Sequence, residues 1–158
     1  ARDLPGDPDD RLARGYRSQS ELLTVSCEAV VQRAVRERVS MVLEGVHIDA
    51  TRVNRLRDSG DIIVVPVVLA VLKQDQLRKR IRGRGGTVPH RRAERYLKNF
   101  DALWQLQSYL LSEADREKMP IVANEDRSST VAEIIRIIGE HLTRQLEPTL
   151  KQVFPPAS

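Results

Sequence analysis

The sequence predicts an α/β fold in which a parallel sheet is covered by helices on both faces, a doubly wound arrangement. Three short runs of consecutive apolar residues alternate along the chain with longer segments in which apolar residues recur at helical spacing. Continuous apolar runs of this kind are typical of strands that are buried on both faces. The hydrophobic share of 41% and the charged share of 30% are those of an ordinary globular domain, which excludes a wholly disordered chain.

The chain is expected to form one domain, because 158 residues suffice for a single hydrophobic core. Residues 1–18 are polar and turn-rich and are interpreted as an N-terminal loop, residues 19–146 as a single α/β domain, and residues 147–158 as a C-terminal tail. The one cysteine, Cys27, excludes an internal disulfide and fits a reducing compartment. No apolar run approaches a membrane span and no signal peptide is visible, so we expect a cytoplasmic protein without a membrane partner.

The first helix is expected over residues 19–38, where Ser18-Gln19-Ser20-Glu21 has the form of a capping box and apolar residues follow at helical spacing. The run 40–47 follows directly and predicts a central strand, because it is short, apolar and bounded by polar residues. Residues 51–59 are interpreted as a short helix that ends at Ser59-Gly60, since glycine commonly follows the last helical residue.

A second central strand is expected over residues 62–72, which are strongly β-branched, with Pro66 indicating a bulge or a late start. Residues 74–82 predict a basic helix, and the glycines and proline within 83–89 predict a mobile loop. A long helix is then expected from residue 90 or 91 to residue 118, because its apolar residues form one stripe. Tyr96 is placed on that apolar face.

The regular structure is expected to close with a short strand over residues 120–124 and a helix capped by Ser129 or Thr130. Asn124 and Asp126 follow this strand, and two interpretations stay open for them. They line a site for a nucleotide base, or they belong to the turn that caps the helix.

Glu44 and His47 are candidates for chemistry because they stand at the end of an expected central strand. In open α/β sheets, ligands bind just past the carboxyl ends of the strands. Glu44 would polarise a metal-bound water or act as a base toward a hydroxyl, unless it is only a strand-end acid bonded to a neighbouring loop. His47 would contact an anionic substrate, or it simply caps the sheet.

The strongest signal is a cluster of basic residues in and around the expected loop, opposed there only by Glu94. The cluster consists of Arg78, Lys79, Arg80, Arg82, Arg84, Arg91, Arg92 and Arg95. Arginine guanidinium groups match phosphate geometry in a bidentate manner, and the adjacent glycines allow a loop that closes over a ligand. Residues 74–95 are therefore interpreted as an arginine-rich lid that binds phosphate, with a solvated basic face or a nucleic-acid patch as alternatives.

Three features together resemble the 2-phosphoglycerate kinase family of P-loop kinases. They are Glu44-Gly45-Val46-His47, the arginine-rich lid, and the segment Arg95-Tyr96-Leu97-Lys98-Asn99-Phe100-Asp101. The resemblance covers residues 20–142 and corresponds to the C-terminal two-thirds of the family. It implies a P-loop-kinase-like doubly wound sheet whose N-terminal strand and P-loop are missing, since no Gly-x-x-x-x-Gly-Lys-Ser/Thr sequence occurs in these residues.

The resemblance also implies ATP, Mg²⁺ and transfer of a phosphoryl group to a small phosphorylated hydroxy acid, this chain being the substrate and lid portion. It assigns catalysis to Glu44 and Arg91, with Glu44 holding the metal through water, and substrate binding to His47, Arg92 and Arg95. It assigns nucleotide binding to Arg78, Arg82, Asn124 and Asp126. The chain alone is expected to be inactive, and a homodimer is left open.

A different class of function also accounts for the basic cluster, namely a non-catalytic module that binds nucleic acid or another polyanion. Such binding weakens steeply with salt and commonly uses aromatic residues on which bases stack. Few aromatic residues are interleaved with the arginines, and Tyr96 and Phe100 are assigned to the apolar face. The kinase interpretation is therefore preferred over a nucleic-acid partner.

Overall fold

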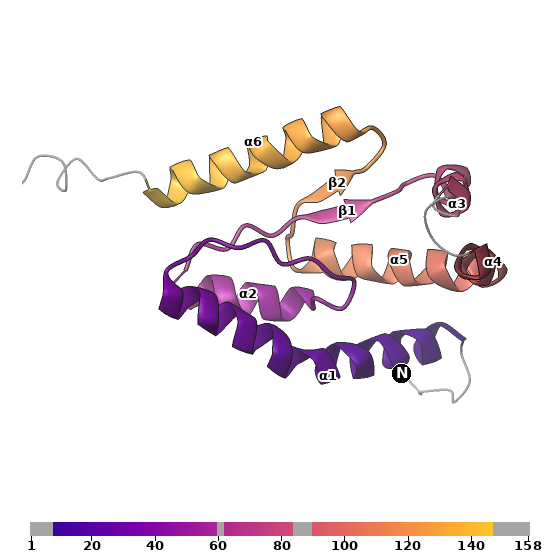
Figure 1. Ribbon diagram of the computed structural model, residues 1–158, viewed down its shortest axis with the longest axis horizontal. Coiled ribbons are helices and arrows are strands. Elements are labelled where there is room, and N and C mark those ends of the chain that lie inside the picture. The colour runs from indigo at the N-terminus through magenta and orange to yellow at the C-terminus, as the bar shows by residue number, and fades with distance from the viewer. Residues whose placement is uncertain (1–7, 60–61, 84–89, 147–158) are drawn as a thin grey trace, which may run out of the picture.

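The structure of the protein is a computed structural model that describes residues 8–59, 62–83 and 90–146 (Figure 1). Within these ranges the chain forms six helices and two strands. They are α1 (Pro8–Glu37), α2 (Ala50–Asp58), β1 (Val68–Ala70), α3 (Gln74–Gly83), α4 (His90–Lys98), α5 (Phe100–Arg116), β2 (Ile121–Ala123) and α6 (Arg127–Leu146).

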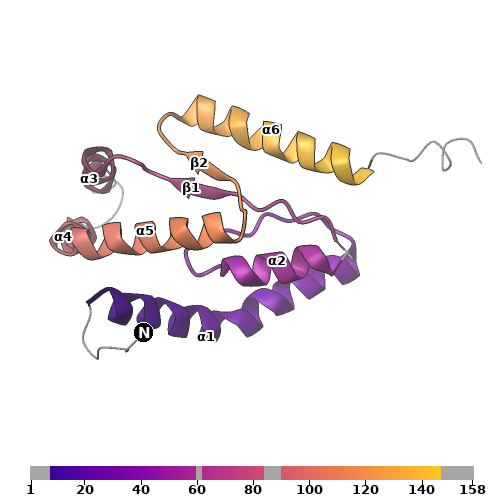
Figure 2. The same cartoon turned by 180° about the vertical axis from the view of Figure 1, so that it is seen from behind.

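A parallel pair of strands lies at the centre of these elements. β1 and β2 are joined in register, with Val68 opposite Ile121, Leu69 opposite Val122 and Ala70 opposite Ala123. Helix α5 covers one face of the pair and α6 the other, and α1 packs on the outer side of α5 (Figures 1 and 2). The expected parallel α/β architecture is confirmed at this level, and the full doubly wound P-loop-kinase topology stays a prediction.

The hydrophobic core lies between the strand pair and the two helices that cover it. Phe100 is its largest fully buried side chain, with 2% of its surface exposed. The other buried apolar side chains around the strands come from β1 and the residue after it, from β2, α5 and α6: Ala70, Val71, Val122, Ala114 and Ile137. The core is thus small and mostly aliphatic, as a sequence poor in aromatic residues requires.

Helix α1 begins at Pro8, so the expectation of an N-terminal loop is wrong for residues 8–18. Proline is favoured in the first helical turn, and the aspartates that follow it favour the positive end of the helix dipole. The longer helix also buries Tyr16 next to Tyr109 of α5, a contact that a loop would not fix. Residues 1–7 lie outside the described ranges.

The expected strand over residues 40–47 is not formed in the described chain, and Val42 is 94% exposed. The expected strand over residues 62–72 is reduced to three residues. Pro66 gives a physical reason for the shortening. Every second residue of a strand directs its backbone N–H and C=O to the same edge, so Pro66 and Val68 both face β2. Val68 N donates to Pro120 O at 2.9 Å, whereas Pro66 has no N–H to donate, so the ladder starts only at Val68.

The long helix expected up to residue 118 is divided at Asn99 into α4 and α5. Asn99 leaves helical geometry, with φ −108° and ψ 29°, and its side-chain Nδ2 donates to Arg95 O at 2.8 Å. The break lets Phe100 turn into the core while α4 packs against α3. Helices α2 and α3 and strand β2 agree with the expected elements to within one residue at each end.

Helix α6 begins before the expected cap at Ser129 or Thr130, so that expectation is wrong. Asp126 is the capping residue instead, because its Oδ2 accepts a hydrogen bond from Ser129 N at 2.8 Å. Thr130, one residue further on, is buried and donates through Oγ1 to Asp126 O at 2.6 Å.

Candidate functional site

The basic helix α3 is attached to the carboxyl end of the parallel strands. Lys73, which precedes α3, lies with its Nζ 3.7 Å from Glu125 Oε1, and Arg80 Nη2 donates to Glu125 O at 2.8 Å. Asn124 N donates to Ala70 O at 2.7 Å, which closes the ladder at the same end. Cationic side chains therefore stand where α/β proteins bind their ligands.

Arg78 holds α3 against the start of α5. Its guanidinium carbon lies 3.6 Å from the centroid of the Phe100 ring, and its Nη2 is 3.6 Å from Asp101 Oδ1. The first contact is a cation–π interaction, and the second is an ion pair with an exposed carboxylate. Arg78 thus has structural contacts, and the nucleotide-binding role that the resemblance assigns to it stays a prediction.

Arg80 and Arg82 lie on α3, and Arg91, Arg92 and Arg95 lie on α4, which packs against α3. Arg82 and Arg95 are exposed, and neither makes a side-chain hydrogen bond or ion pair with the described part of the chain. The backbone of Arg91 and Arg92 belongs to the first turn of α4, and their side chains lie outside what the structure describes. The glycine-rich stretch 84–89 also lies outside it.

Asp126 and Asn124 follow β2, as the sequence indicated. Hydrogen bonds from the backbone N–H of Ser129, from its hydroxyl and from the neighbouring N–H groups lower the pKa of Asp126, because they stabilise its charged form. Asp126 therefore caps α6, which was the alternative to a nucleotide-binding role. Asn124 is half-buried at the end of the strand. A nucleotide-binding role for either residue stays a prediction.

His47 lies against α1, and the structure shows no contact of Glu44 or His47 with α3 among the described residues. Glu44 is exposed and makes no hydrogen bond or ion pair within the described ranges. His47 is half-buried and stacks on Tyr16, with ring centroids 5.6 Å apart and planes inclined by 25°. Its Nδ1 is buried without a hydrogen-bond partner among the described residues. A water or a polar group of a bound molecule would satisfy this nitrogen.

The sequence did not indicate the aromatic cluster that supports His47. Tyr16 contacts His47 on one side and Tyr109 on the other, with centroids 5.8 Å apart in the second pair. Burial raises the pKa of the Tyr16 phenol. Arg17 Nε donates to Tyr109 OH at 3.0 Å, so this arginine is drawn toward α5.

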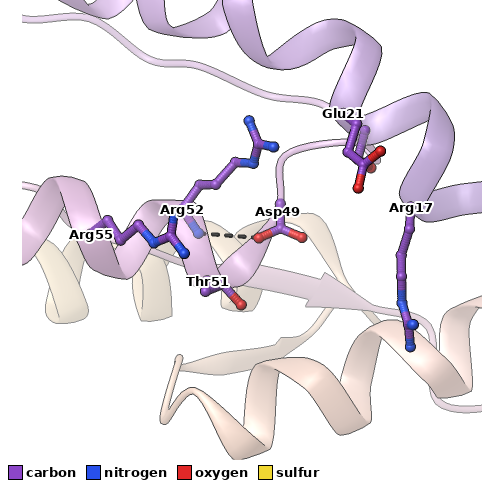
Figure 3. Close-up of a pocket in the computed structure, with 7 residues that line it drawn as sticks. Arg17, Glu21, Asp49, Thr51, Arg52 and Arg55 are labelled. Atoms are coloured by element: carbon purple, nitrogen blue, oxygen red, sulfur yellow. Dashed lines mark hydrogen bonds between the residues drawn. The ribbon is translucent and has the colours of Figure 1, made fainter.

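A pocket of about 190 Å³ opens beside this cluster, between α1 and the start of α2 (Figure 3). Its lining combines three arginines with two carboxylates and two hydroxyls: Arg17, Ser20, Glu21, Asp49, Thr51, Arg52 and Arg55. Asp49 Oδ1 accepts from Arg52 N at 3.1 Å and caps α2. In Figure 3 the Arg17 side chain points away from Asp49, toward α5. The sequence signal that was missed is an Asp two residues after His47 that precedes a short arginine-rich helix.

The donor set for a metal ion is sparse in the described ranges, where no group of three or more His, Cys, Asp and Glu side chains could hold one. Mg²⁺ in kinases is commonly held by one or two carboxylates together with the phosphates of the substrate. A role of Glu44 toward such an ion, through a bound water, stays a prediction. Within the same ranges no helix has the length and apolar character needed to cross a membrane.

Several curated proteins are similar to this chain. A 2-phosphoglycerate kinase from Methanocaldococcus jannaschii is 30% identical over 146 residues, which is 91% of this chain and 46% of that protein. The 2-phosphoglycerate kinase from Methanopyrus kandleri is 30% identical over 141 residues (86% and 42%), and the one from Thermococcus kodakarensis 31% over 126 residues (80% and 41%).

The chain spans less than half the length of these curated relatives. No family model matches the chain. No solved structure matches it either. The resemblance that was first indicated by Glu44–His47, the basic cluster and Arg95–Asp101 is nevertheless confirmed, since this chain is similar to 2-phosphoglycerate kinases along most of its length.

Proposed function

We propose that this chain is part of a kinase that transfers a phosphoryl group from ATP to a small phosphorylated hydroxy acid, and that it supplies the substrate and lid portion. The observation that carries the proposal is the attachment of α3 to the carboxyl end of the strand pair through Lys73, Arg80 and Glu125. The names of the relatives support the same reaction.

Cations at this edge are what phosphoryl transfer needs. Charge spreads over the oxygens of the transferring group, and catalysis consists mainly of positioning that group and neutralising its charge. Arg78 and Arg82 lie four residues apart on α3, that is, about one helical turn apart. ATP with Mg²⁺ would supply the phosphoryl group, and these side chains would orient and neutralise it.

The arginines of α4 would serve the acceptor. Arg91 and Arg95 are four residues apart, and Arg92 and Arg95 are three apart, so the three start from neighbouring positions on one side of the helix. Such a group matches an acceptor that carries both a carboxylate and a phosphate. Glu44 would position the metal-bound water or the attacking hydroxyl, and His47 would contact the acceptor.

Calorimetric titration of this chain with 2-phosphoglycerate and with ATP–Mg²⁺ tests the proposal. We expect saturable binding of at least one ligand, weakened about tenfold or more by Arg82→Ala, because a charge-assisted hydrogen bond contributes about 1.5–3 kcal/mol. Arg33→Ala is the matched control, since Arg33 is an exposed arginine on α1, paired with Glu37. Absence of binding, or equal weakening by both substitutions, would contradict the proposal.

One observation favours the polyanion-binding alternative, and it corrects an expectation. Tyr96 is 51% exposed instead of lying on the apolar face, so it stands next to Arg95 on an accessible surface. A base can stack on such a ring while arginines hold the phosphates. Binding of a single-stranded oligonucleotide that weakens steeply with salt and is lost in Tyr96→Ala would support this function in place of the kinase.

A further inference from the structure

The pocket between α1 and the start of α2 presents charged groups that the described chain does not pair (Figure 3). Arg52 and Arg55 lie three residues apart on α2, so they share one side of the helix. Neither guanidinium makes a hydrogen bond or an ion pair with a described residue, and the same holds for the Glu21 carboxylate on α1. Neighbouring arginines of this kind match the oxygens of a carboxylate or a phosphate.

Ser20 adds a buried hydroxyl group to the lining of the pocket. Only 4% of its surface is exposed, and its Oγ has no hydrogen-bond partner in the described part of the chain. Tyr16, one helical turn earlier, is close enough for Ser20 to lower the pKa of its phenol, against the raising effect of burial. Buried polar groups are normally satisfied, and rotation about χ1 turns a serine hydroxyl toward a new partner. The Ser20 hydroxyl therefore indicates a ligand that carries a hydrogen-bonding group of its own.

The charge of the pocket is nearly balanced, which restricts the class of ligand. Arg17 donates to Tyr109 OH, and its side chain points away from Asp49 in Figure 3. The guanidinium groups of α2 then stand beside two carboxylates, those of Glu21 and Asp49. The carboxylates would repel a polyanion. A small acid with hydroxyl groups instead offers an anion to the arginines and donors to the carboxylate oxygens.

The pocket adjoins the residue that the resemblance assigns to the substrate. Asp49 comes two residues after His47, and Ser20 comes one helical turn after Tyr16, on which His47 stacks. In Figures 1 and 2 the chain enters α2 from the side of the molecule on which α3 and α4 lie. A ligand in the pocket would therefore lie toward the same end of the molecule as the arginines proposed to bind phosphate.

We propose that this pocket binds the carboxylate and the hydroxyl group of the acceptor. Arg52 and Arg55 hold the carboxylate. Ser20 and Asp49 bond to the hydroxyl, Asp49 through the carboxylate oxygen that does not cap α2. The inference rests on the proposed function, because the acceptor, a small phosphorylated hydroxy acid, is part of that proposal. The arginines of α4 would then bind the phosphate of the acceptor, and Glu44 the metal-bound water.

NMR titration of this chain with D-glycerate and with propionate tests the pocket without a phosphate group. Glycerate carries a carboxylate and hydroxyl groups, and propionate carries the carboxylate alone on a carbon chain of the same length. We expect glycerate to shift the backbone amides of residues 20–21 and 49–55 saturably and to leave those of α3 and α4 unchanged. Propionate should bind at the same residues about tenfold more weakly, because it leaves the partners of the hydroxyl unpaired.

Substitutions separate the two parts of the proposed site. Arg52→Gln should weaken glycerate and propionate alike, by about tenfold, because it removes a charge-assisted hydrogen bond to the carboxylate. Ser20→Ala should weaken glycerate by about threefold or more and leave propionate unchanged. Arg57→Gln is the matched control on the same helix, since Arg57 does not line the pocket and its Nε lies 3.5 Å from Asp58 Oδ1. A melting curve of each variant verifies that it is folded.

Several outcomes would overturn the proposal. They are the absence of saturable shifts at the pocket, equal affinities for the two acids, and a Ser20→Ala variant that weakens both acids alike. An Arg57→Gln variant that binds glycerate as weakly as Arg52→Gln would also contradict it.

Failure of the proposed function would be a different result. If Arg82→Ala weakens the binding of 2-phosphoglycerate and Arg52→Gln does not, the kinase proposal stands and the pocket assignment is wrong. If glycerate binds in the pocket while Arg82→Ala changes the binding of neither 2-phosphoglycerate nor ATP–Mg²⁺, the pocket assignment stands and the kinase proposal is wrong.

Discussion

Replacing Gln107 of α5 tests whether its carboxamide takes the place of a neighbouring peptide group at Val71, the residue after β1. Gln107 Nε2 donates to Val71 O at 3.0 Å, and Val71 N donates to Gln107 Oε1 at 3.2 Å. Gln107→Leu keeps the approximate size of the side chain but removes both hydrogen bonds to the buried residue Val71. Each lost bond to a buried backbone group costs about 1–3 kcal/mol, so we expect the loss of two bonds to lower the free energy of unfolding by about 2–6 kcal/mol. For a chain of this size, each kcal/mol corresponds to roughly 2–4 °C in the melting temperature.

Urea denaturation followed by circular dichroism measures this effect. Gln105→Leu is the matched control, because Gln105 is an exposed glutamine two residues earlier on α5. Its free energy of unfolding should change by less than about 0.5 kcal/mol. A loss below 1 kcal/mol in Gln107→Leu, or an equal loss in the control, would refute the argument that the carboxamide replaces a peptide group.

Gln107→Glu adds a dependence on pH with a defined sign. A charged carboxylate accepts from Val71 N but cannot donate to Val71 O, so the fold should favour the protonated acid and raise its pKa. The stability of this variant relative to the wild type should be highest at pH values below the unfolded-state pKa. It should fall as the pH rises through the raised pKa of the folded state. A relative stability that rises with pH would refute the assignment.

Two further predictions concern the core and the helix cap. Phe100→Ala removes the largest fully buried side chain and should lower the free energy of unfolding by about 3–5 kcal/mol, and a double-mutant cycle with Arg78→Ala should reveal a coupling between them. Additive effects would show that the stacking adds nothing. Asp126→Ala should lower the melting temperature above the unfolded-state pKa of the aspartate, with the difference disappearing as the pH falls through the lowered folded-state pKa, because only the charged form caps α6 strongly. Asp126→Asn keeps a capping oxygen, so it should retain most of the stability and lose the pH dependence.

Most helices could be predicted from the sequence, because their signals are local. The apolar spacing and the basic composition of 74–82 placed α3, and the Ser59-Gly60 pair placed the end of α2. The strands could not be predicted at their full extent, since a strand also requires a neighbour. Residues 40–47 have strand composition but are assigned to no strand in the described chain, and 62–72 retains only the part that Pro66 and β2 permit.

The types of residue in the candidate site could be predicted from the sequence better than the contacts that these residues make. Helix α3 and the residues after β2 do lie at one edge, but the contacts of Lys73 and Arg80 with Glu125 that join them were not predicted. Arg78 was assigned to a ligand, and it also stacks on Phe100, which is distant enough in the sequence that no local pattern pairs them. Long-range contacts of this kind depend on how α3 packs against other elements. The spacing of residues along the sequence does not give that packing.

The separation of Glu44 from α3 decides what this chain can do by itself. Glu44 belongs to the exposed segment 39–46, which has apolar residues but no strand partner to fix its backbone. The contacts of α3 with Glu125 and Phe100, by contrast, are made within this chain. We therefore expect this chain to bind a phosphorylated acid through α3 and α4 without transferring a phosphoryl group. Turnover by this chain alone, measured as ADP release with ATP–Mg²⁺ and 2-phosphoglycerate, would contradict this expectation.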